Sequence, residues 1–253
     1  MSKNFIWSIV FFILMIREGG LFAQPEIWCL PEYSEDELVI RHVGFTLKYD
    51  KNHKLSDWVA YDIVPYKLLK SVKKSNHFIP DPQLPDEWSA HSIDYKYSGY
   101  DRGHLAPAAD MAWSAQAMKE SFYLSNICPQ QPQFNRITWK KLEEKVRQWA
   151  RIYDTLLITT GPVLSSDLPK IGHGKVSVPK YFYKAVVIYT HHKKSGIAFV
   201  MQNSYSSKVL MQSAITIDSL ERLTGFNFFA RLPEEEQLNI EGKLIIEDWN
   251  ILR

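Results

Sequence analysis

Short segments with a two-residue repeat follow one another along this chain, whereas a helical repeat occurs in only two places. Strands are predicted at residues 39–49, 58–63, 156–160, 181–190 and 197–202, with turns at residues 50–53 and 191–196. Their alternation of apolar and polar residues is typical of half-buried strands, and the apolar run before Gly161-Pro162 is typical of a buried one. Strands joined by such short turns are expected to pair in antiparallel fashion.

Two stretches carry apolar residues at the three- and four-residue steps of an amphipathic helix. One runs from Asn135 to Tyr153, with Trp139 among its predicted core anchors. The other runs from Ile217 to Leu223, and Gly225 supplies a C-terminal cap. Because predicted strands outnumber predicted helices, the expected fold class is α+β, with a central antiparallel sheet flanked by helices.

The chain is long enough for one domain with a full core. Of its 253 residues, 45% are hydrophobic, and neither a repeat nor an internal linker interrupts residues 24–253. Its 30 basic and 28 acidic side chains leave a net charge of only +2. Any surface that binds a polyanion must therefore be a local patch.

Residues 1–23 are predicted to be a bacterial-type signal peptide. Lys3 precedes an apolar run over residues 5–16, and small residues lead to a cleavage position after Ala23. The run is short for a membrane span. The mature chain is therefore expected outside the membrane, in a secreted or periplasmic location. Arg17 and Glu18 are unusual beside a cleavage position, which leaves an uncleaved anchor as the alternative.

The two cysteines, Cys29 and Cys128, allow at most one bridge. An oxidising compartment would permit that bridge, and two separate thiols are the alternative. Their distant positions, without a Cys-x-x-Cys pair, give no metal-binding signature.

Chemically versatile residues gather at Asp101-Arg102-Gly103-His104. An imidazole titrates near neutral pH, so His104 can act as a general base. In an extended segment Arg102 would lie on the same side as His104 and could contact a phosphate. Gly103 permits a close approach of the backbone, and Asp101 is expected to fix the loop by accepting backbone hydrogen bonds.

Further along the chain, polar side chains occur on the first predicted helix. Asn135, Trp139, Glu143 and Arg147 follow one another at four-residue steps, which keeps them on one slowly drifting face. An amide oxygen in the first turn and a carboxylate two turns later can hold a hard cation, largely through water. Mg²⁺ favours such a site because it gives up its hydration shell reluctantly.

Together these motifs resemble the signature of the DNA/RNA non-specific endonuclease family, which includes secreted bacterial nucleases and mitochondrial endonuclease G. The matching residues are Asp101 to His104, Ser125-Asn126, Pro129-Gln130, Asn135-Arg136, Trp139 and Leu142-Glu143. The similarity runs from about His42 to about Glu241 and covers nearly all of the mature chain. It implies a ββα-metal, or His-Me finger, motif, in which a hairpin delivers the histidine and a helix delivers the metal ligand.

The resemblance also implies roles for single residues. His104 corresponds to the general base, Asn135 to the direct protein ligand of the metal, and Glu143 to a carboxylate that holds metal-bound water. The implied cofactor is Mg²⁺, with Mn²⁺ as a substitute. Three further residues correspond to supporting active-site residues that orient the cluster or neutralise phosphate: Arg102, Asn126 and Arg147.

One position departs from the family pattern. Relatives place an arginine near a Phe-x-x-Asp-Pro signature, but no arginine occurs between Arg41 and Arg102 in this chain. Lys74, upstream of residues 78–82, is the expected replacement. Because lysine supplies charge without the bidentate fork of a guanidinium, reduced turnover is one expected consequence.

The predicted function is that of a metal-dependent endonuclease that hydrolyses DNA and RNA with little sequence preference and leaves 5′-phosphate ends. Lys74 and Arg136 are predicted to bind nucleic acid. The alternative is a nucleic-acid-binding module of the same fold with weak or lost catalysis, and a cell-surface structural domain is a third hypothesis. The sequence leaves a homodimer and an inhibitor protein open. Other basic residues of the helix form either a phosphate track or a solvated face: Lys140, Lys141, Lys145 and Arg151.

Overall fold

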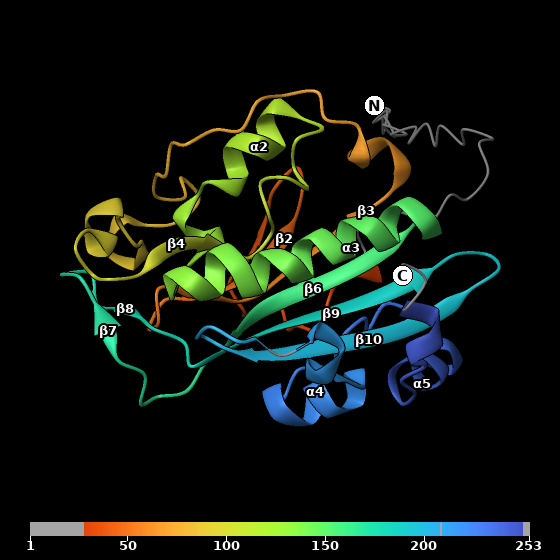
Figure 1. Cartoon of the computed structure of the whole chain (residues 1–253). Coiled ribbons are helices and arrows are strands. Elements are labelled where there is room, and N and C mark those ends of the chain that lie inside the picture. Colours follow the sequence, from red (N-terminus) through yellow and green to blue (C-terminus); the bar gives the residue numbers. More distant parts are fainter. Residues whose placement is uncertain (1–27, 208, 250–253) are drawn as a thin grey trace, which may run out of the picture.

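An antiparallel sheet lies at the centre of the computed structural model, which describes residues 28–207 and 209–249. Seven strands pair in the order β1-β2-β3-β6-β9-β10-β11, and each neighbouring pair is antiparallel (Figure 1). The predicted α+β class with a central antiparallel sheet is therefore confirmed. The strands are β1 (Val39–Arg41), β2 (Thr46–Asp50), β3 (Leu55–Ile63), β6 (Leu156–Val163), β9 (Tyr181–Tyr189), β10 (Lys194–Gln202) and β11 (Ala214–Ile215).

Side chains of this sheet alternate between two hydrophobic cores. On β3, Val59 and Tyr61 belong to one core, whereas Trp58 and Ala60 belong to the other. Neighbouring residues of a strand point to opposite faces, so the two cores lie on the two sides of the sheet. Because both sides of the central strands are removed from water, most of their residues are apolar, and the polar ones among them, such as Asp62, Thr160 and Lys184, are buried.

Helices cover both faces of the sheet. α3 (Lys140–Tyr153) packs on one face, and α4 (Ile217–Thr224) and α5 (Glu234–Glu241) pack on the other (Figure 1). The apolar stripe of α3 includes Leu142 and Trp149, which are fully buried. Burial of each such side chain contributes about 1.5–3 kcal/mol. This contribution holds α3 in a fixed position, and α3 carries several of the predicted site residues.

Several strand predictions differ from the structure. Residues 39–49 are a hairpin rather than one strand, since β1 and β2 pair with Val39 opposite Lys48. The turn is closed by a hydrogen bond of 2.8 Å from the His42 N–H to the Phe45 carbonyl. The apolar alternation continues through this turn, so the pattern could not reveal it. A second difference is that β6 runs through Gly161-Pro162 to Val163. Two strands also begin earlier than predicted, β3 at Leu55 and β10 at Lys194, which lies inside the predicted turn at residues 191–196.

The helix predictions are confirmed in part. α4 lies where it was predicted, and Gly225 caps it with a φ of 76°, in the left-handed region that favours glycine. α2 (Ala115–Ser121) and α5 were not predicted, because both are short and carry weak apolar periodicity. The remaining elements are β4 (Asp101–His104), β5 (Ile127–Gln130), β7 (Lys170–Ile171), β8 (Val176–Ser177), a π-helical segment (Phe134–Trp139) and 3₁₀ turns at Pro65–Leu68, Asp86–Trp88, Ser92–Tyr95, Leu124–Asn126, Leu210–Ser213 and Ile246–Trp249.

The two cysteines lie in different cores. Cys128 is a buried free thiol in the core under α3, whereas Cys29 packs in the core on the opposite face of the sheet. This separation supports two thiols rather than the bridge that the sequence left open. The predicted signal peptide, residues 1–23, lies outside the described residues. Within the described part of the chain, no helix has the length and apolar character needed to span a bilayer.

Candidate active site

A small antiparallel pair of strands, β4 and β5, positions the backbone of His104. In its register, Gly103 lies opposite Cys128 and His104 lies opposite Ile127. A Cβ atom on Gly103 would lie 2.1 Å from Oε1 of the buried Gln130 side chain. Glycine at this position therefore allows the side chain of Gln130 to pack directly against β4. The two strands and the helix that follows them form the ββα arrangement that the resemblance implies.

Aromatic packing holds the imidazole of His104. Its ring centroid lies 4.8 Å from that of Phe122 and 5.6 Å from that of Phe78. Nε2 is buried and has no hydrogen-bond partner among the described residues. Burial, together with the nearby charge of Lys74, lowers the pKa of His104 from 6.5 to about 3. The imidazole is therefore neutral and can accept a proton.

Asp101 orients the amide of Asn135. Nδ2 of Asn135 donates to Oδ2 of Asp101 at 3.0 Å, and Arg136 binds the same carboxylate through Nε at 2.8 Å and Nη2 at 2.6 Å. A carboxylate only accepts hydrogen bonds, so the amide nitrogen must face Asp101 and Oδ1 faces away. The prediction that Asp101 accepts backbone hydrogen bonds is therefore wrong, because side chains take that place. Part of the charge of Arg136 is neutralised in this pair.

Asn135 lies in the π-helical segment Phe134–Trp139, which leads directly into α3. Such segments are rare, and many of them occur at functional sites. The regular helix predicted from Asn135 onward is therefore wrong over its first turns. Trp139 is fully buried, as predicted, and Phe134 stacks on Phe182 of β9 with ring centroids 5.4 Å apart. These contacts fix the segment on the sheet.

The buried carboxylate of Asp110 connects α3 to the central sheet. Its Oδ1 accepts a hydrogen bond of 2.9 Å from Nη1 of Arg147, and its Oδ2 accepts one of 3.2 Å from the hydroxyl of Tyr61. Arg147, predicted to support the active site, is thus engaged with Asp110 and is mostly buried. This geometry favours orientation of the cluster over direct contact with phosphate as the role of Arg147.

A buried lysine lies beneath Glu143. Lys184 of β9 is fully buried, and its Nζ lies 3.5 Å from the carbonyl oxygen of Leu105, the residue after His104. Burial raises the pKa of Glu143, and the charge of Lys184 opposes that rise. Burial lowers the pKa of Lys184, and the charge of Glu143 opposes that fall. Each charge therefore helps to keep the other ionised in a region with little water.

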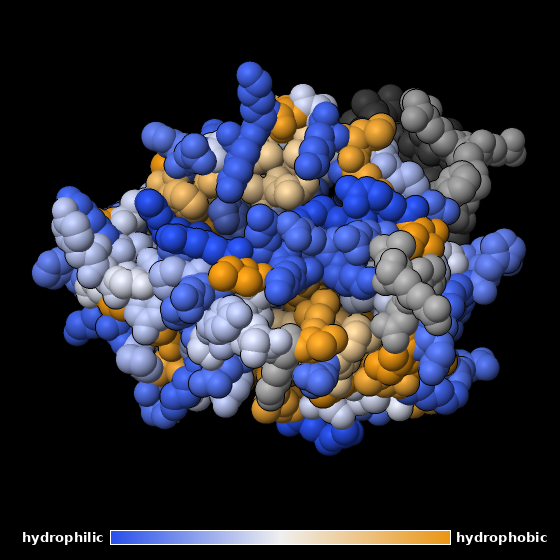
Figure 2. Space-filling model, in the orientation of Figure 1, coloured by the Kyte–Doolittle hydropathy of each residue, from blue (hydrophilic) through white to orange (hydrophobic). Residues whose placement is uncertain are grey.

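Four predicted residues line one pocket of about 300 Å³, here called the His104 pocket: Lys74, His104, Asn135 and Glu143. Lys70 and Lys74, both exposed, contribute to its wall. Figure 2 shows a hydrophilic band across the face that α3 covers in Figure 1, and this face carries the exposed Lys140 and Lys141. The other lining residues of the pocket are Val72, Pro107, Ala108, Ala109, Ala112 and Met118.

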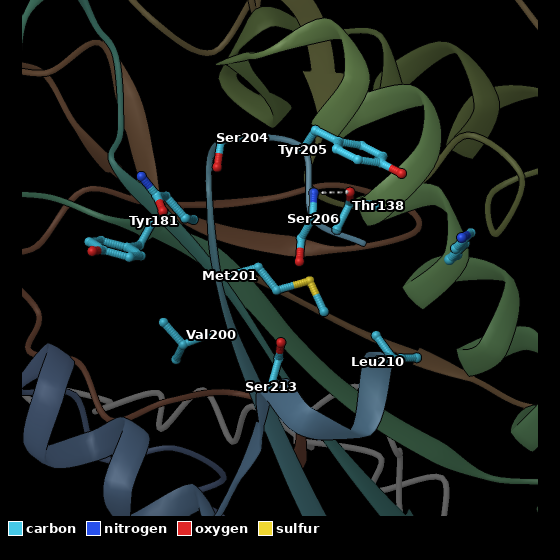
Figure 3. A pocket seen from close by; sticks show the side chains of 11 residues that line it. Thr138, Tyr181, Val200, Met201, Ser204, Tyr205, Ser206, Leu210 and Ser213 are labelled. Carbon is cyan, nitrogen blue, oxygen red and sulfur yellow. Dashed lines mark hydrogen bonds between the residues drawn. The ribbon is translucent and has the colours of Figure 1, made fainter. Parts of the chain in front are cut away.

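A second pocket, of about 370 Å³, contains none of the predicted site residues (Figure 3). Hydroxyl and apolar side chains such as Tyr181, Met201 and Ser213 surround it. Among the described residues of its lining, Lys141 is the one ionisable group besides the tyrosines Tyr181 and Tyr205. The described lining therefore offers neither a histidine nor a carboxylate, whereas the smaller His104 pocket offers both.

Arg102 and Asn126 lie near the His104 pocket without lining it. Arg102 is exposed, and its guanidinium carbon lies 4.5 Å above the ring of Phe78, which also contacts His104. The two residues therefore share one side of β4, as predicted. Asn126 is fully buried, and its amide exchanges hydrogen bonds of 2.9 Å with both backbone groups of Ala106. These hydrogen bonds join Ala106, at the start of the connection between β4 and β5, to Asn126 at its end.

The sequence interpretation missed Asp110, Lys184 and Asp81. Lys184 had a usable signal, since it is a charged residue at a position of β9 where its alternate neighbours are buried and apolar. Asp81 lies in the noted signature at residues 78–82 and accepts hydrogen bonds from Nε2 of His42 (2.9 Å) and Oγ of Ser125 (2.6 Å). Burial opposes ionisation of Asp81, but these hydrogen bonds lower its pKa overall.

Proteins with similar sequences and structures are nucleases. Nuclease EXOG of Danio rerio is 33% identical over 236 residues, which cover 87% of this chain and 66% of that protein. A nuclease of Nostoc sp. is 31% identical, with coverage of 79% of this chain and 76% of that protein. A crystal structure of an EndoG/EndoGI complex superposes with a TM-score of 0.76 at 27% identity, covering 87% of this chain and 96% of that one. The chain thus spans about two thirds of the EXOG relative.

These relatives correct the predicted localisation. The proteins named EXOG from zebrafish, frog, mouse and human are mitochondrial nucleases, as are similar nucleases from two yeasts and bovine endonuclease G. The prediction of a secreted or periplasmic protein is therefore wrong. It rested on the apolar composition of residues 5–16, which does not identify the destination of a leader segment by itself.

The sequence profile of one family extends over most of the chain. Residues 31–235 match the DNA/RNA non-specific endonuclease family, a range that contains β4, β5, the π-helical segment and α3. The ββα geometry and the pocket that joins His104 to Asn135 and Glu143 agree with this match. The chain therefore belongs to the DNA/RNA non-specific endonuclease family.

Proposed function

We propose that this protein is a metal-dependent endonuclease that hydrolyses phosphodiester bonds of both DNA and RNA and leaves 5′-phosphate ends. The observation that carries the proposal is the His104 pocket, where a neutral imidazole lies beside an amide oxygen and a carboxylate. His104 lies on β4, Asn135 lies in the π-helical segment, and Glu143 lies on α3. Hydrolysis of a phosphodiester requires these elements, namely a base and groups that hold a cation.

The donor set fits a hard divalent cation. Oδ1 of Asn135 faces away from Asp101, and the carboxylate of Glu143 forms no hydrogen bond with any described residue. Mg²⁺ binds oxygen ligands and keeps several waters, so one amide oxygen with a carboxylate that acts through water suits it, and Mn²⁺ can replace it. Such an ion would supply positive charge to the phosphate and to the departing 3′ oxygen.

The residues of the chain account for proton transfer and orientation. His104 accepts the proton of the attacking water through a ring nitrogen. Phosphate bound nearby would raise the pKa of His104 toward neutrality, because negative charge favours the imidazolium form. Asp101 fixes the direction of the Asn135 amide, and the charges of Lys184 and Arg147 favour the ionised form of Glu143 against the effect of burial. Lys74 takes the place of the family arginine beside the phosphate.

Recognition is proposed to use phosphates rather than bases. The basic residues near the pocket, Lys70 and Lys74 in its wall and Arg102 beside it, are exposed and suited to contact phosphate oxygens. Among the described elements, none has the form of a zinc finger or a helix-turn-helix that would read base edges. Cleavage should therefore show little sequence preference, and binding should weaken steeply with salt because condensed counterions are released.

The test is cleavage of plasmid DNA and of RNA with Mg²⁺, Mn²⁺ or EDTA, compared between the wild type and His104→Ala. Loss of the base should reduce the rate by about 10²–10⁴-fold with unchanged DNA affinity, and added imidazole should restore part of it. His191→Ala, at an exposed hairpin tip, is the matched control. Salt-dependent binding without cleavage by the wild type would support the binding module instead. Ligation of the products would identify the terminal phosphate.

A further inference from the structure

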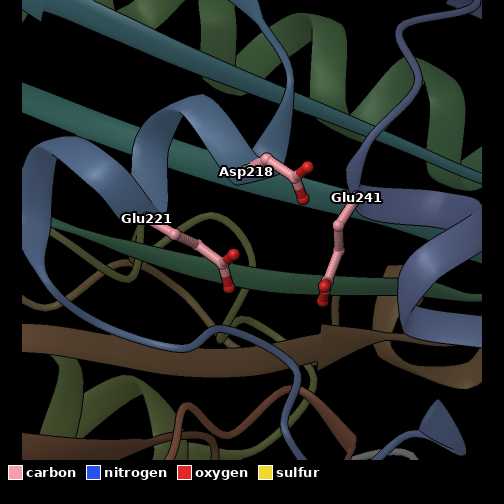
Figure 4. Close-up of side chains that lie close together, drawn as sticks. All are labelled: Asp218, Glu221 and Glu241. Carbon is pink, nitrogen blue, oxygen red and sulfur yellow. The ribbon is translucent and has the colours of Figure 1, made fainter.

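Three carboxylates meet on the face of the sheet opposite the His104 pocket. Asp218 and Glu221 lie one turn apart on α4, and Glu241 is the last residue of α5. When one carboxylate oxygen is taken from each residue, the three oxygens all lie within 4.8 Å of one another. Figure 4 shows the carboxylates of Asp218 and Glu221 directed toward that of Glu241. Residues distant in sequence thus bring three negative charges together.

Glu241 differs from an ordinary surface acid. Glu241 is only 6% exposed. Its Oε1 atom is buried and has no hydrogen-bond partner among the described residues. Within the same part of the chain, no lysine, arginine or histidine forms an ion pair with Asp218, Glu221 or Glu241. A buried carboxylate without a hydrogen bond or a cation is costly.

Packing of the backbone keeps the carboxylates together. Gly196 of β10 lies so close to α5 that a Cβ there would be 2.7 Å from the carbonyl oxygen of Ile240. Gly242, which follows α5, would place a Cβ 3.3 Å from Oδ2 of Asp218. The end of α5 is therefore pressed against both the sheet and α4. The three carboxylates could move apart only if α5 moved away from the core.

The three carboxylates repel one another when they are ionised. Burial, followed by the charges of Glu221 and Asp218, raises the pKa of Glu241 to about 8. Burial also raises the pKa of Glu221, although one of its oxygens accepts a hydrogen bond of 2.8 Å from the Phe228 N–H. Uptake of either a proton or a cation lowers the repulsion in the cluster, and a cation can in addition contact all three carboxylates at once.

We propose that Asp218, Glu221 and Glu241 bind a divalent cation of the Ca²⁺ type, which joins α4 to α5. All donors are oxygens, so the site does not suit Zn²⁺, which favours nitrogen and sulfur. Ca²⁺ binds oxygen at about 2.3–2.6 Å and can therefore bridge oxygens up to about 4.8 Å apart, farther than Mg²⁺ allows. Asp218 and Glu221 are partly exposed, which leaves room for water to complete the coordination shell.

Calcium titration of the full chain by calorimetry separates this site from the His104 pocket. The Asn135→Ala variant should retain one bound Ca²⁺, whereas Glu241→Gln should lose that equivalent and keep its Mg²⁺-dependent nuclease rate. Loss of all Ca²⁺ binding in Asn135→Ala would overturn the proposal, as would unchanged stoichiometry in Glu241→Gln. Glu235→Gln, at an exposed position of α5, is the matched control and should bind as the wild type does.

Thermal unfolding gives a second measurement. A hundredfold excess of Ca²⁺ over its Kd should raise the wild-type Tm by roughly 5–10 °C, and Glu241→Gln should show no such rise. Should Glu241→Gln fail to fold, Asp218→Asn at its partly exposed position provides the same comparison. An equal Ca²⁺ shift in the wild type and Asp218→Asn would refute the site.

Discussion

A methyl group on Gly103 should disturb both stability and catalysis. In Gly103→Ala, the new Cβ would lie 2.1 Å from Oε1, 2.2 Å from Cδ and 2.5 Å from Cγ of Gln130. These distances are far below van der Waals contact, and the collision includes Cγ as well as the tip of the side chain. Gln130 is fully buried, so it cannot turn toward solvent. Either its side chain or the pairing of β4 with β5 must change.

The size of the effect follows from this geometry. Inserting a methyl group into a packed interior costs about 1–3 kcal/mol, and we expect the upper half of that range because three atoms collide. Gly103 directly precedes His104, so the strand shift also moves the base. A displacement of about 1 Å at a reacting group lowers the rate about 10²-fold. Urea unfolding measures the stability, and plasmid nicking at saturating Mg²⁺ measures the rate.

A double variant tests the cause. Gly103→Ala/Gln130→Ala removes the colliding atoms, so it should be more stable than the sum of the two single changes predicts, by about 1–2 kcal/mol. Nicking should recover with it. If Gly103→Ala keeps wild-type stability and rate, or if the two changes are additive, then contact between Gly103 and Gln130 does not position His104.

Other predictions concern metal, charge and pH. Asn135→Ala should nearly abolish cleavage at any Mg²⁺ concentration, whereas Glu143→Gln should raise the Mg²⁺ concentration needed for half-maximal nicking. If calorimetry shows that both variants bind the metal as tightly as the wild type, the ion binds elsewhere. Lys184→Met should raise the pKa of Glu143 further and shift the acidic limb of the pH–rate profile upward by roughly one unit, and an unshifted limb would contradict this. Asp81, whose pKa is lowered on folding, stabilises the protein above its unfolded pKa of about 3.9 and loses that contribution as pH falls further. Asp81→Asn should therefore be less stable at pH 7 and show a flatter loss of stability below pH 4 in urea unfolding.

Local sequence signals brought out the residues of the proposed site but not the residues that support them. The Asp101-to-His104 motif and Asn135 were evident because neighbouring residues carry them. Lys184, by contrast, reaches Glu143 only because β9 packs under α3. No pattern within a single segment encodes that contact. The partner of Asp101 was misjudged for the same reason, since Asn135 comes beside it only when β5 and the π-helical segment fold back.

Strand prediction failed where two elements shared one pattern. Residues 39–49 alternate as one strand would, but they turn at Gly44, where a Cβ would lie 2.4 Å from the Met111 sulfur. The need for glycine there comes from a residue far along the chain. Sequence periodicity describes which residues are buried, and it does not reveal which distant atoms bury them.

The π-helical segment sets the spacing between Asn135 and Glu143, the two residues proposed to hold the metal. In a uniform α-helix each residue rotates by about 100°, so the step from Asn135 to Glu143 would leave their side chains about 80° apart. A π-helical turn contains more residues and rotates less per residue, which brings both side chains toward one direction. A relative with a uniform helix would need its carboxylate about seven residues after the asparagine. Alignments of distant relatives should therefore permit a one-residue gap within residues 134–139.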